Sequence, residues 1–533
     1  MTQLRNSKKF RVETNFKILL DKFSIDIVLA IIIAIGLFVL ALYLKSLIGD
    51  WIKEEIGYSF NYLTHNSSGE VVIWYLEIYN DAEYYYESYL EAFRYNDWNP
   101  YVRSAGELDF YVYGPIYIYG LWFISLFVGV FNPSISQEIL IKESVKWTAI
   151  TFEALTIVML YVMIIELKMF KERRTAKHVF GTIGAIALIF APMNLLYVDA
   201  YYLNIPQMLF FTMLSIYLFM KEKYIFSACV LTLAWFSKQM PLFLLIPLFF
   251  LLVRKENVTF ALRKFMFPFI GSSFLFSIPW IFMTPHLYII RIIGAGRPLW
   301  YLTLGHEGIQ HGVTLAHSFL HLGIKPLAYF YFYINFPMLP FIFFYFLSIL
   351  IAHFNAEKIN TDETYFILLI TWIIILTHAF ISRGLFKYYG AFFSPFLILT
   401  ALMLLEKAIQ IYKEEKSTEL IEEKTNDYTK KIQIEYYFKS IIFDTVLIIT
   451  FLSSIILIFY YEWVIMITIR FLHPLWLAIL FLILLAFFPL SFYKSIFISE
   501  NYMDFEKDFI SAFRKTKEEV VYFWKRYILR KKE

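Results

Sequence analysis

The chain has a single cysteine, Cys229, which lies within an apolar run, so no disulfide can form within the chain. Charged residues are scarce as well: they make up 17% of the sequence, whereas soluble domains carry about 25%. The formal net charge of +4 gives no indication of a nucleic-acid partner, and none is expected. The sequence also has no Gly-rich phosphate loop and no Rossmann pattern.

Apolar and aromatic residues are abundant instead. Hydrophobic residues make up 59% of the 533 positions and aromatic residues 21%, and the mean hydropathy is +0.59. These values predict an all-α polytopic membrane protein with about twelve transmembrane helices. Long apolar runs occupy 24–48, 145–165, 179–198, 264–284, 326–352, 363–382, 387–406, 439–461 and 469–493. Shorter runs at 205–220, 224–237 and 240–253 are expected to be spans too.

The distribution of charge predicts the orientation. Basic clusters at Lys8–Lys22, Lys168–Lys177, Lys221/Lys223, Arg254–Lys264 and Lys525–Lys532 are expected to be cytosolic. Residues 50–109 carry twelve acids against three bases, which predicts that this segment faces outward. If 116–131 crossed the membrane once, the cluster Lys168–Lys177 would fall outside. That run is therefore interpreted as a re-entrant or surface-lying helix, and short surface helices are expected in the first outer loop.

The resulting organisation has six parts. They are a cytosolic N-terminus (1–23), a catalytic-type membrane module (24–260) with outer loop 49–144, a variable membrane module (261–406) with outer loop 285–325, a charged cytosolic linker (407–438), a C-terminal transmembrane pair (439–498) and a basic amphipathic tail (499–533) suited to the anionic inner leaflet.

The ionisable groups at the expected outer boundary suggest a single site. They are Asp81, Asp109, Asp199, Lys238, Arg383 and Lys387. Charges at membrane depth are costly and often mark function. A carboxylate with several cations is suited to deprotonating an acceptor hydroxyl while holding a leaving phosphate. Asp81 would be the general base. The alternative is an acidic surface helix whose tyrosines lie at the membrane interface.

The cations and histidines also allow two interpretations each. Lys238 lies in a long apolar stretch, and Arg383 and Lys387 would share a helix face, which favours a phosphate or pyrophosphate partner. Snorkelling or interface anchoring would explain the same residues. Loop 285–325 holds five of the ten histidines, but no carboxylate joins them at a zinc spacing. Recognition of a sugar hydroxyl or phosphate by His306 or His311 is therefore favoured over metal binding, and no cofactor is expected.

Four short elements then resemble one enzyme family. They are Asp81-Ala82-Glu83-Tyr84, Leu108-Asp109-Phe110 followed by Pro115, Asp199 followed by Asn204, and Phe236-Ser237-Lys238-Gln239-Met240. In order and spacing they resemble the C-type glycosyltransferase superfamily (GT-C), and more narrowly its dolichyl-phosphate-glucose-dependent glucosyltransferases of the N-glycan pathway. The resemblance covers roughly residues 24–260. The family's double proline is missing, and Tyr201 and Tyr202 replace its His-rich signature.

The resemblance implies a GT-C-like fold and an inverting hexosyltransferase. Its donor would be a polyprenyl (dolichyl) phosphate-linked sugar, and its acceptor a lipid-linked glycan, a lipid or a protein. The protein would be a multi-pass membrane protein. Its membrane would be the plasma membrane of a prokaryote, with archaea favoured, or the membrane of the endoplasmic reticulum. Asp81 would be catalytic. The substrate-binding set would be Glu83, Asp109, Asp199, Asn204, Lys238, Gln239, His306, His311, Arg383, Lys387 and Tyr388.

Other classes of function stay open at this point. A transporter or flippase for a lipid-linked saccharide would use the same groove and cations but would need no base. A protein O-glycosyltransferase of the same superfamily would differ in its acceptor. A non-catalytic membrane scaffold would bury its charges in pairs and would bind no lipid-linked sugar.

The predicted topology can be tested by cysteine labelling in a Cys229→Ala background. A cysteine at position 66 should react with an impermeant reagent in intact cells or vesicles of native orientation, whereas one within 407–438 should react only after permeabilisation. Labelling of position 66 only after permeabilisation would contradict the topology.

Overall fold

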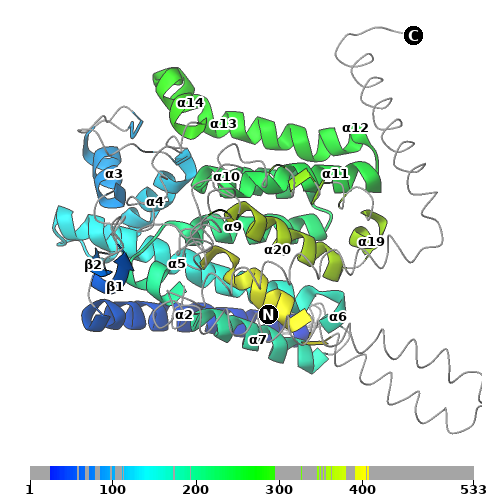
Figure 1. Ribbon diagram of the computed structural model, residues 1–533, viewed down its shortest axis with the longest axis horizontal. Coiled ribbons are helices and arrows are strands. Elements are labelled where there is room, and N and C mark those ends of the chain that lie inside the picture. The colour runs from blue at the N-terminus through cyan, green and yellow to red at the C-terminus, as the bar shows by residue number, and fades with distance from the viewer. Residues whose placement is uncertain are drawn as a thin grey trace, which may run out of the picture.

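The protein is described by a computed structural model, in which most of the chain from α2 to the helix at 391–403 is helical (Figure 1). The residues it describes are 25–56, 59–65, 71–77, 85–96, 99–101, 111, 113–171, 174–191, 194–293, 326, 342, 345–346, 348–349, 352, 356–361, 363–379, 391–403 and 405–406. The predicted segments 1–23, 407–438, 439–498 and 499–533 lie wholly outside these residues.

Three helical stretches in the described part are long and apolar enough to cross a membrane: Asp26–Trp51, Gln137–Glu166 and Val258–Met283. The first lies in α2 (Ile25–Ile56), and the second is α5 (Gln137–Glu166). The third combines α12 (Val258–Ala261), η5 (Leu262–Met266) and α13 (Phe267–Met283). The expected total of about twelve spans stays a prediction.

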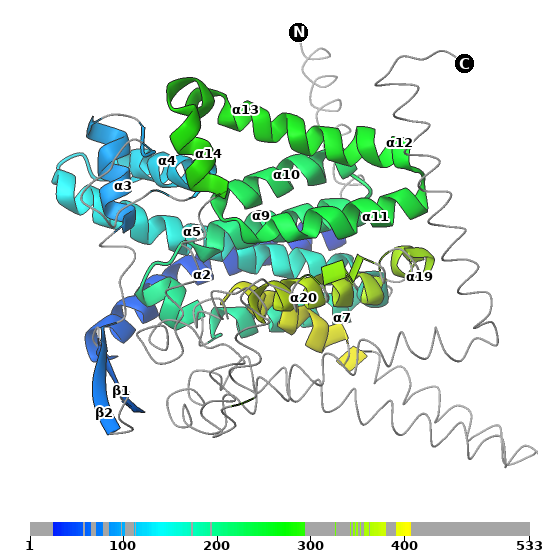
Figure 2. The same cartoon turned by 45° about the horizontal axis from the view of Figure 1, so that its top comes forward.

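Shorter apolar helices pack beside these three. They are α4 (Pro115–Phe131), α7 (Arg174–Ile189), α9 (Ile205–Met220), α10 (Tyr224–Ser237), α11 (Leu245–Lys255), α20 (Glu363–Ala379) and the helix at 391–403. Figures 1 and 2 show α2, α5, α9, α10 and α13 with their axes aligned, so that the described core is a helical bundle. The remaining short helices are α6 (Lys168–Lys171), α14 (Pro285–Ile293) and α19 (Ala356–Thr361).

Most predicted apolar runs correspond to helices, with one difference in extent. The bounds of α9 and α10 coincide with the predicted runs 205–220 and 224–237. The run 179–198, in contrast, is not one helix. It is divided between α7, which ends at Ile189, and the π-helical η3 (Leu195–Ala200). The sequence has Pro192 between them, and a proline cannot donate the backbone hydrogen bond that a continuous helix needs.

The first outer loop contains a hairpin in addition to short helices. Strand β1 (Ser59–His65) pairs antiparallel with β2 (Val71–Glu77), with Ser59 opposite Glu77. The β2 sequence Val-Val-Ile-Trp-Tyr-Leu is rich in the β-branched and aromatic residues that favour strands. The short helices expected in this loop are α3 (Glu87–Glu91) and η2 (Ala92–Asn96). The helical description therefore fits the bundle, and the loop adds two strands to it.

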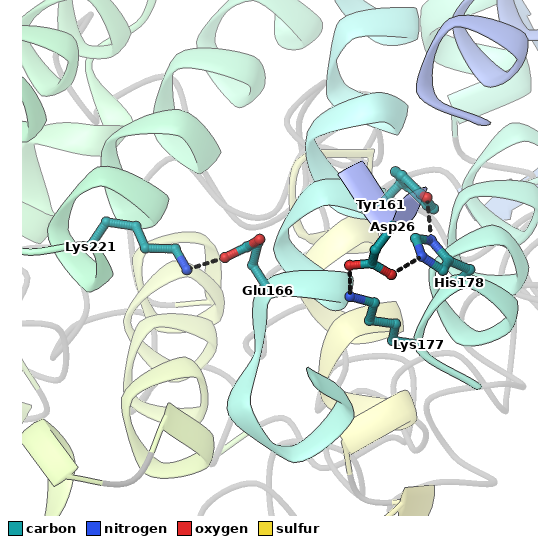
Figure 3. A network of polar contacts seen from close by, with 6 residues as sticks. All are labelled: Asp26, Tyr161, Glu166, Lys177, His178 and Lys221. Carbon is teal, nitrogen blue, oxygen red and sulfur yellow. Dashed lines mark hydrogen bonds and ion pairs between the residues drawn. The ribbon is translucent and has the colours of Figure 1, made fainter. Parts of the chain in front are cut away.

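Ion pairs mark the two ends of the bundle. At one end, Asp26 accepts hydrogen bonds from Lys177 at 2.5 Å and from His178 at 3.0 Å, and His178 also contacts Tyr161 at 2.8 Å (Figure 3). At the other end, Asp50 accepts a hydrogen bond from Lys146 at 2.6 Å. Asp50 follows Asp26 by 24 positions on α2, which corresponds to about 36 Å of helix.

The described basic clusters gather at the Asp26 end. Lys177 contacts Asp26 there, and Lys221 pairs with Glu166 at the end of α5 (Figure 3). Lys255 pairs with Glu222, which follows Lys221 in the turn after α9. Three of the predicted cytosolic clusters therefore share one end of the molecule, as a common membrane side requires.

Helix α4 lies beside α3 and the first part of α5, at the Asp50 end (Figures 1 and 2). Its residue Gly129 faces Leu140, which belongs to the first turns of α5. The two helices are joined by the short turn 132–136, so α4 runs back along the half of α5 nearest Asp50. That arrangement agrees with a helix belonging to the outer loop. That 116–131 does not cross the membrane stays a prediction.

Two glycines of α2 test the packing of this helix. A Cβ at Gly49 would lie 2.3 Å from the backbone oxygen of Asp199, whereas a Cβ at Gly36 would meet nothing within 4 Å. We expect Gly49→Ala to destabilise the protein by about 1–3 kcal/mol through overpacking. Gly36→Ala should be neutral or stabilising by up to about 1 kcal/mol, because alanine favours helix. Thermal unfolding of the purified variants in detergent measures both, and equal melting temperatures would contradict the packing.

Candidate functional site

Lys238 and Asn204, 34 residues apart, meet at the Asp50 half of the bundle. Lys238 Nζ donates a hydrogen bond to Asn204 Oδ1 at 2.9 Å, and both residues are buried, with 6% and 3% exposure. Lys238 follows the last residue of α10 in an extended conformation, which turns its side chain away from the helix axis. Asn204 immediately precedes α9, whose Pro206 suits a first turn because proline lacks the N–H that would be unsatisfied there.

The described groups at this point include a positive charge, a helix N-terminus and an amide donor. The N-terminus of α9 carries a partial positive charge, and the Lys238 ammonium contacts Asn204, the residue that precedes α9. Asn204 Nδ2, a further donor, is buried with no partner among the residues that the structure describes. Like charges repel, so a bound anion would stabilise this arrangement.

A cluster of tyrosines from the outer loop borders Lys238. The ammonium lies 5.9 Å from the centre of the Tyr113 ring, within the range of a cation–π contact. Tyr101 donates to the backbone oxygen of Tyr113 at 2.9 Å, and Tyr111 donates to that of Gly114 at 2.7 Å. Burial raises the pKa of Tyr111 well above its usual value, so its hydroxyl stays neutral and keeps donating. These bonds fix the segment that leads into α4.

Close backbone packing holds the same segment against α10. A Cβ at Gly114 would lie 2.4 Å from the Cα of Phe236, so only glycine fits at this contact. Phe236 begins the element Phe236–Met240 that contains Lys238. The structure therefore brings together parts of three segments that carry the family resemblance: 111–115, the turn before α9, and 236–240. Gln239 contributes its backbone oxygen to a hydrogen bond from the Leu242 N–H at 3.1 Å.

Asp199 belongs to a different set of contacts from Lys238, although the sequence analysis grouped both residues at the outer boundary. It is fully buried in η3, and its Oδ2 accepts a hydrogen bond from Lys45 Nζ at 2.8 Å. The turn between η3 and α9 is compact, because Tyr202 adopts a left-handed conformation (φ 53°) and its hydroxyl donates to Asp50 at 3.3 Å. Asp199 and Asn204 therefore face different surroundings, and only Asn204 joins Lys238.

The sequence analysis missed three residues that surround Asp199: Lys45, Glu153 and Asn194, all fully buried. The signal for two of them was present. Lys45 and Glu153 are charged residues inside the predicted spans 24–48 and 145–165, and an ionisable residue within a span is a functional candidate by default. Asn194 had no such signal, because one asparagine near a proline is common at a chain turn.

The other predicted site residues lie outside the described residues. They are Asp81, Glu83, Asp109, His306, His311, Arg383, Lys387 and Tyr388. Their placement relative to Lys238 stays a prediction. Within the described part of the chain, no three or more histidine, cysteine or acidic side chains come together in a way that would hold a metal ion.

A comparison of the sequence with models of known protein families and with functionally characterised proteins found no significant match. The arguments for function therefore rest on the residues themselves and on the resemblance of the four short elements.

The Lys238–Asn204 hydrogen bond should contribute to the free energy of unfolding. Asn204→Leu should cost about 1.5–3 kcal/mol, because a buried ammonium loses a hydrogen-bond acceptor. The double variant Lys238→Met with Asn204→Leu should be more stable than Asn204→Leu alone, because no ammonium is left without its Asn204 acceptor. Thermal unfolding of wild type, both single variants and the double variant forms a complete cycle. Additive effects would show that the two side chains do not interact.

Proposed function

We propose that this protein is a multi-pass membrane glycosyltransferase of the GT-C type, which transfers a hexose from a polyprenyl-phosphate carrier to an acceptor on the outer or lumenal face. The observation that carries the proposal is the buried Lys238–Asn204 pair at the start of α9, beside the tyrosine cluster. It combines an ammonium, an amide donor without a partner among the described residues, and a helix N-terminus, which together suit a phosphate. The fold around it is a bundle with helices long enough to cross a membrane.

The phosphate of the donor lipid would lie against these groups. In the reaction the sugar–phosphate C–O bond breaks, and its electron pair stays on the polyprenyl phosphate, which gains negative charge. Lys238 and the α9 N-terminus would offset that charge. Asn204 orients the ammonium through its carbonyl oxygen and leaves its amide N–H groups for the phosphate oxygens. Arg383 and Lys387 are proposed as further phosphate contacts.

Asp81 is proposed as the general base. It would take the proton of an acceptor hydroxyl while that oxygen forms a new bond to the anomeric carbon, opposite the departing phosphate. This displacement inverts the configuration in one step, so one base is sufficient and no carboxylate nucleophile is needed. Glu83 and Asp109 are proposed to contact the acceptor, and the histidines His306 and His311 to contact sugar hydroxyls or phosphate. The acceptor class is a lipid-linked glycan, a lipid or a protein.

The test of the reaction uses purified full-length protein with labelled polyprenyl-phosphate glucose or mannose and a set of lipid and peptide acceptors. We expect transfer by the wild type and a loss of about 10²–10⁴-fold in turnover for Asp81→Asn, with donor binding retained. Glu83→Gln is the matched control and should cost far less. If Asp81→Asn were as active as wild type, Asp81 would not be the base. If the wild type moved the donor lipid between leaflets without transferring hexose, the protein would be a transporter.

The proposed contact between Lys238 and the donor phosphate can be tested by kinetics. Lys238→Ala should raise KM for the donor about ten- to hundredfold with little change in kcat, because the contact exists in both ground and transition states. The control is Lys142→Ala, which removes a half-exposed lysine paired with Glu138 on α5. Steady-state kinetics with varied donor concentration measure both variants. An unchanged donor KM in Lys238→Ala would show that this lysine does not bind the phosphate.

A further inference from the structure

A cluster of three charged residues lies inside the bundle, separate from the Lys238 site. It consists of Lys45 from α2, Glu153 from α5 and Asp199 from η3, and all three side chains have 0% exposure. Asn194, also fully buried, lies next to η3 and donates from Nδ2 to Glu153 Oε1 at 2.7 Å. The cluster joins three segments of the chain that are far apart in sequence.

The cluster lies farther into the bundle than the Asp50–Lys146 ion pair at the Asp50 end. Lys45 precedes Asp50 by five residues on α2, and Glu153 follows Lys146 by seven residues on α5. At 1.5 Å per residue, the cluster is about 7–10 Å deeper in the bundle than the Asp50–Lys146 pair. It therefore belongs to the part of α2 and α5 that is apolar enough to span a membrane.

The charges in this cluster do not balance. Two carboxylates face one ammonium: Lys45 Nζ lies 2.8 Å from Asp199 Oδ2 and 3.5 Å from Glu153 Oε1. Among the described residues that act on these two acids, Lys45 is the only cation, and Asn194 is neutral. With both acids ionised, one negative charge would remain uncompensated in a dry interior, which is strongly unfavourable.

The cluster also has too few hydrogen-bond donors for its acceptors among the described residues. Three oxygen atoms of the cluster have no partner among the described residues: Glu153 Oε2, Asp199 Oδ1 and Asn194 Oδ1. All three are acceptors, and all are fully buried, so the cluster lacks a donor. One hydrogen on a carboxyl oxygen would remove the excess charge and would also supply a donor. A single proton therefore removes the excess charge and converts one of the three unpartnered acceptors into a donor.

We propose that the cluster is a proton-binding site and that Glu153 holds the proton. Asp199 is closer to the ammonium and forms the ion pair with Lys45. Glu153 Oε1 is farther from Lys45 and already accepts a hydrogen bond from a neutral amide, so its carboxyl group is the one that becomes neutral. The added hydrogen lies on Oε2, which changes from an acceptor without a partner among the described residues to a donor.

Infrared spectroscopy of the full-length protein in lipid vesicles tests this proposal. A protonated carboxyl group has a C=O band that is separate from those of ionised carboxylates and shifts in D₂O. We expect such a band in the wild type at neutral pH, its loss in Glu153→Gln, and its retention in Asp50→Asn. Asp50 is the matched control because it also pairs with a lysine of the bundle, Lys146, but is half-exposed. A band that persists in Glu153→Gln would overturn the assignment.

Three further measurements separate a proton on Glu153 from a bound metal cation. The first is the infrared spectrum of Asp199→Asn. In this variant Glu153 is the one acid left in the cluster to pair with Lys45 and should ionise, so the band should disappear although Glu153 is present. Glu153→Gln is close in shape to a protonated glutamate and should melt within a few degrees of wild type; a variant that does not fold would contradict the proposal. If the wild type lacked the band and melted higher in sodium than in choline buffer, a metal cation would balance the charge and the proposal would be wrong.

Discussion

Lys45 lies inside the helical bundle because two acids from other parts of the chain meet it there. A buried ammonium without partners would be too costly for the fold to tolerate, so α2, α5 and η3 can pack only in the register that brings Asp199 and Glu153 to it. The close approach of Gly49 to the Asp199 backbone fixes the same register from α2. Apolar packing alone would allow helices to slide or rotate, whereas this contact specifies one arrangement.

The Lys238 region depends on a second set of constraints, which come from the outer loop. Tyrosine hydroxyls bind the backbone of the segment before α4, and Gly114 lets that segment touch α10. Tyrosine suits this role because its ring is apolar enough to be buried while its hydroxyl still finds an acceptor. The abundance of tyrosine in the loop therefore has a structural reason within the described part of the chain, in addition to any contact with substrate.

The sequence predicted the local features of this protein better than its long-range ones. The bounds of α9 and α10 could be predicted because apolar runs end at charged or proline-containing turns. The pairing of Lys238 with Asn204 was not predicted as a contact, although both residues were named as site candidates. The Lys45–Asp199 pair joins positions 154 residues apart, and no periodicity within a single segment encodes such a partner. Hydropathy likewise gave no indication that Asp199 contacts Lys45, because a π-helical turn buried among helices has no distinctive sequence pattern.

In the proposed membrane protein, the two ion pairs at the ends of α2 would determine which bilayer thickness suits the bundle. About 36 Å of helix separates Asp26 from Asp50, and both residues remain partly exposed, at 35% and 47%. A hydrocarbon layer of ~30 Å leaves each pair at the level of the lipid headgroups. In a markedly thicker bilayer, one pair would enter the hydrocarbon unless the bundle thinned the lipid around it. For the proposed membrane protein, hydrophobic thickness would therefore select the bilayer in which this bundle is stable, before any substrate or partner does.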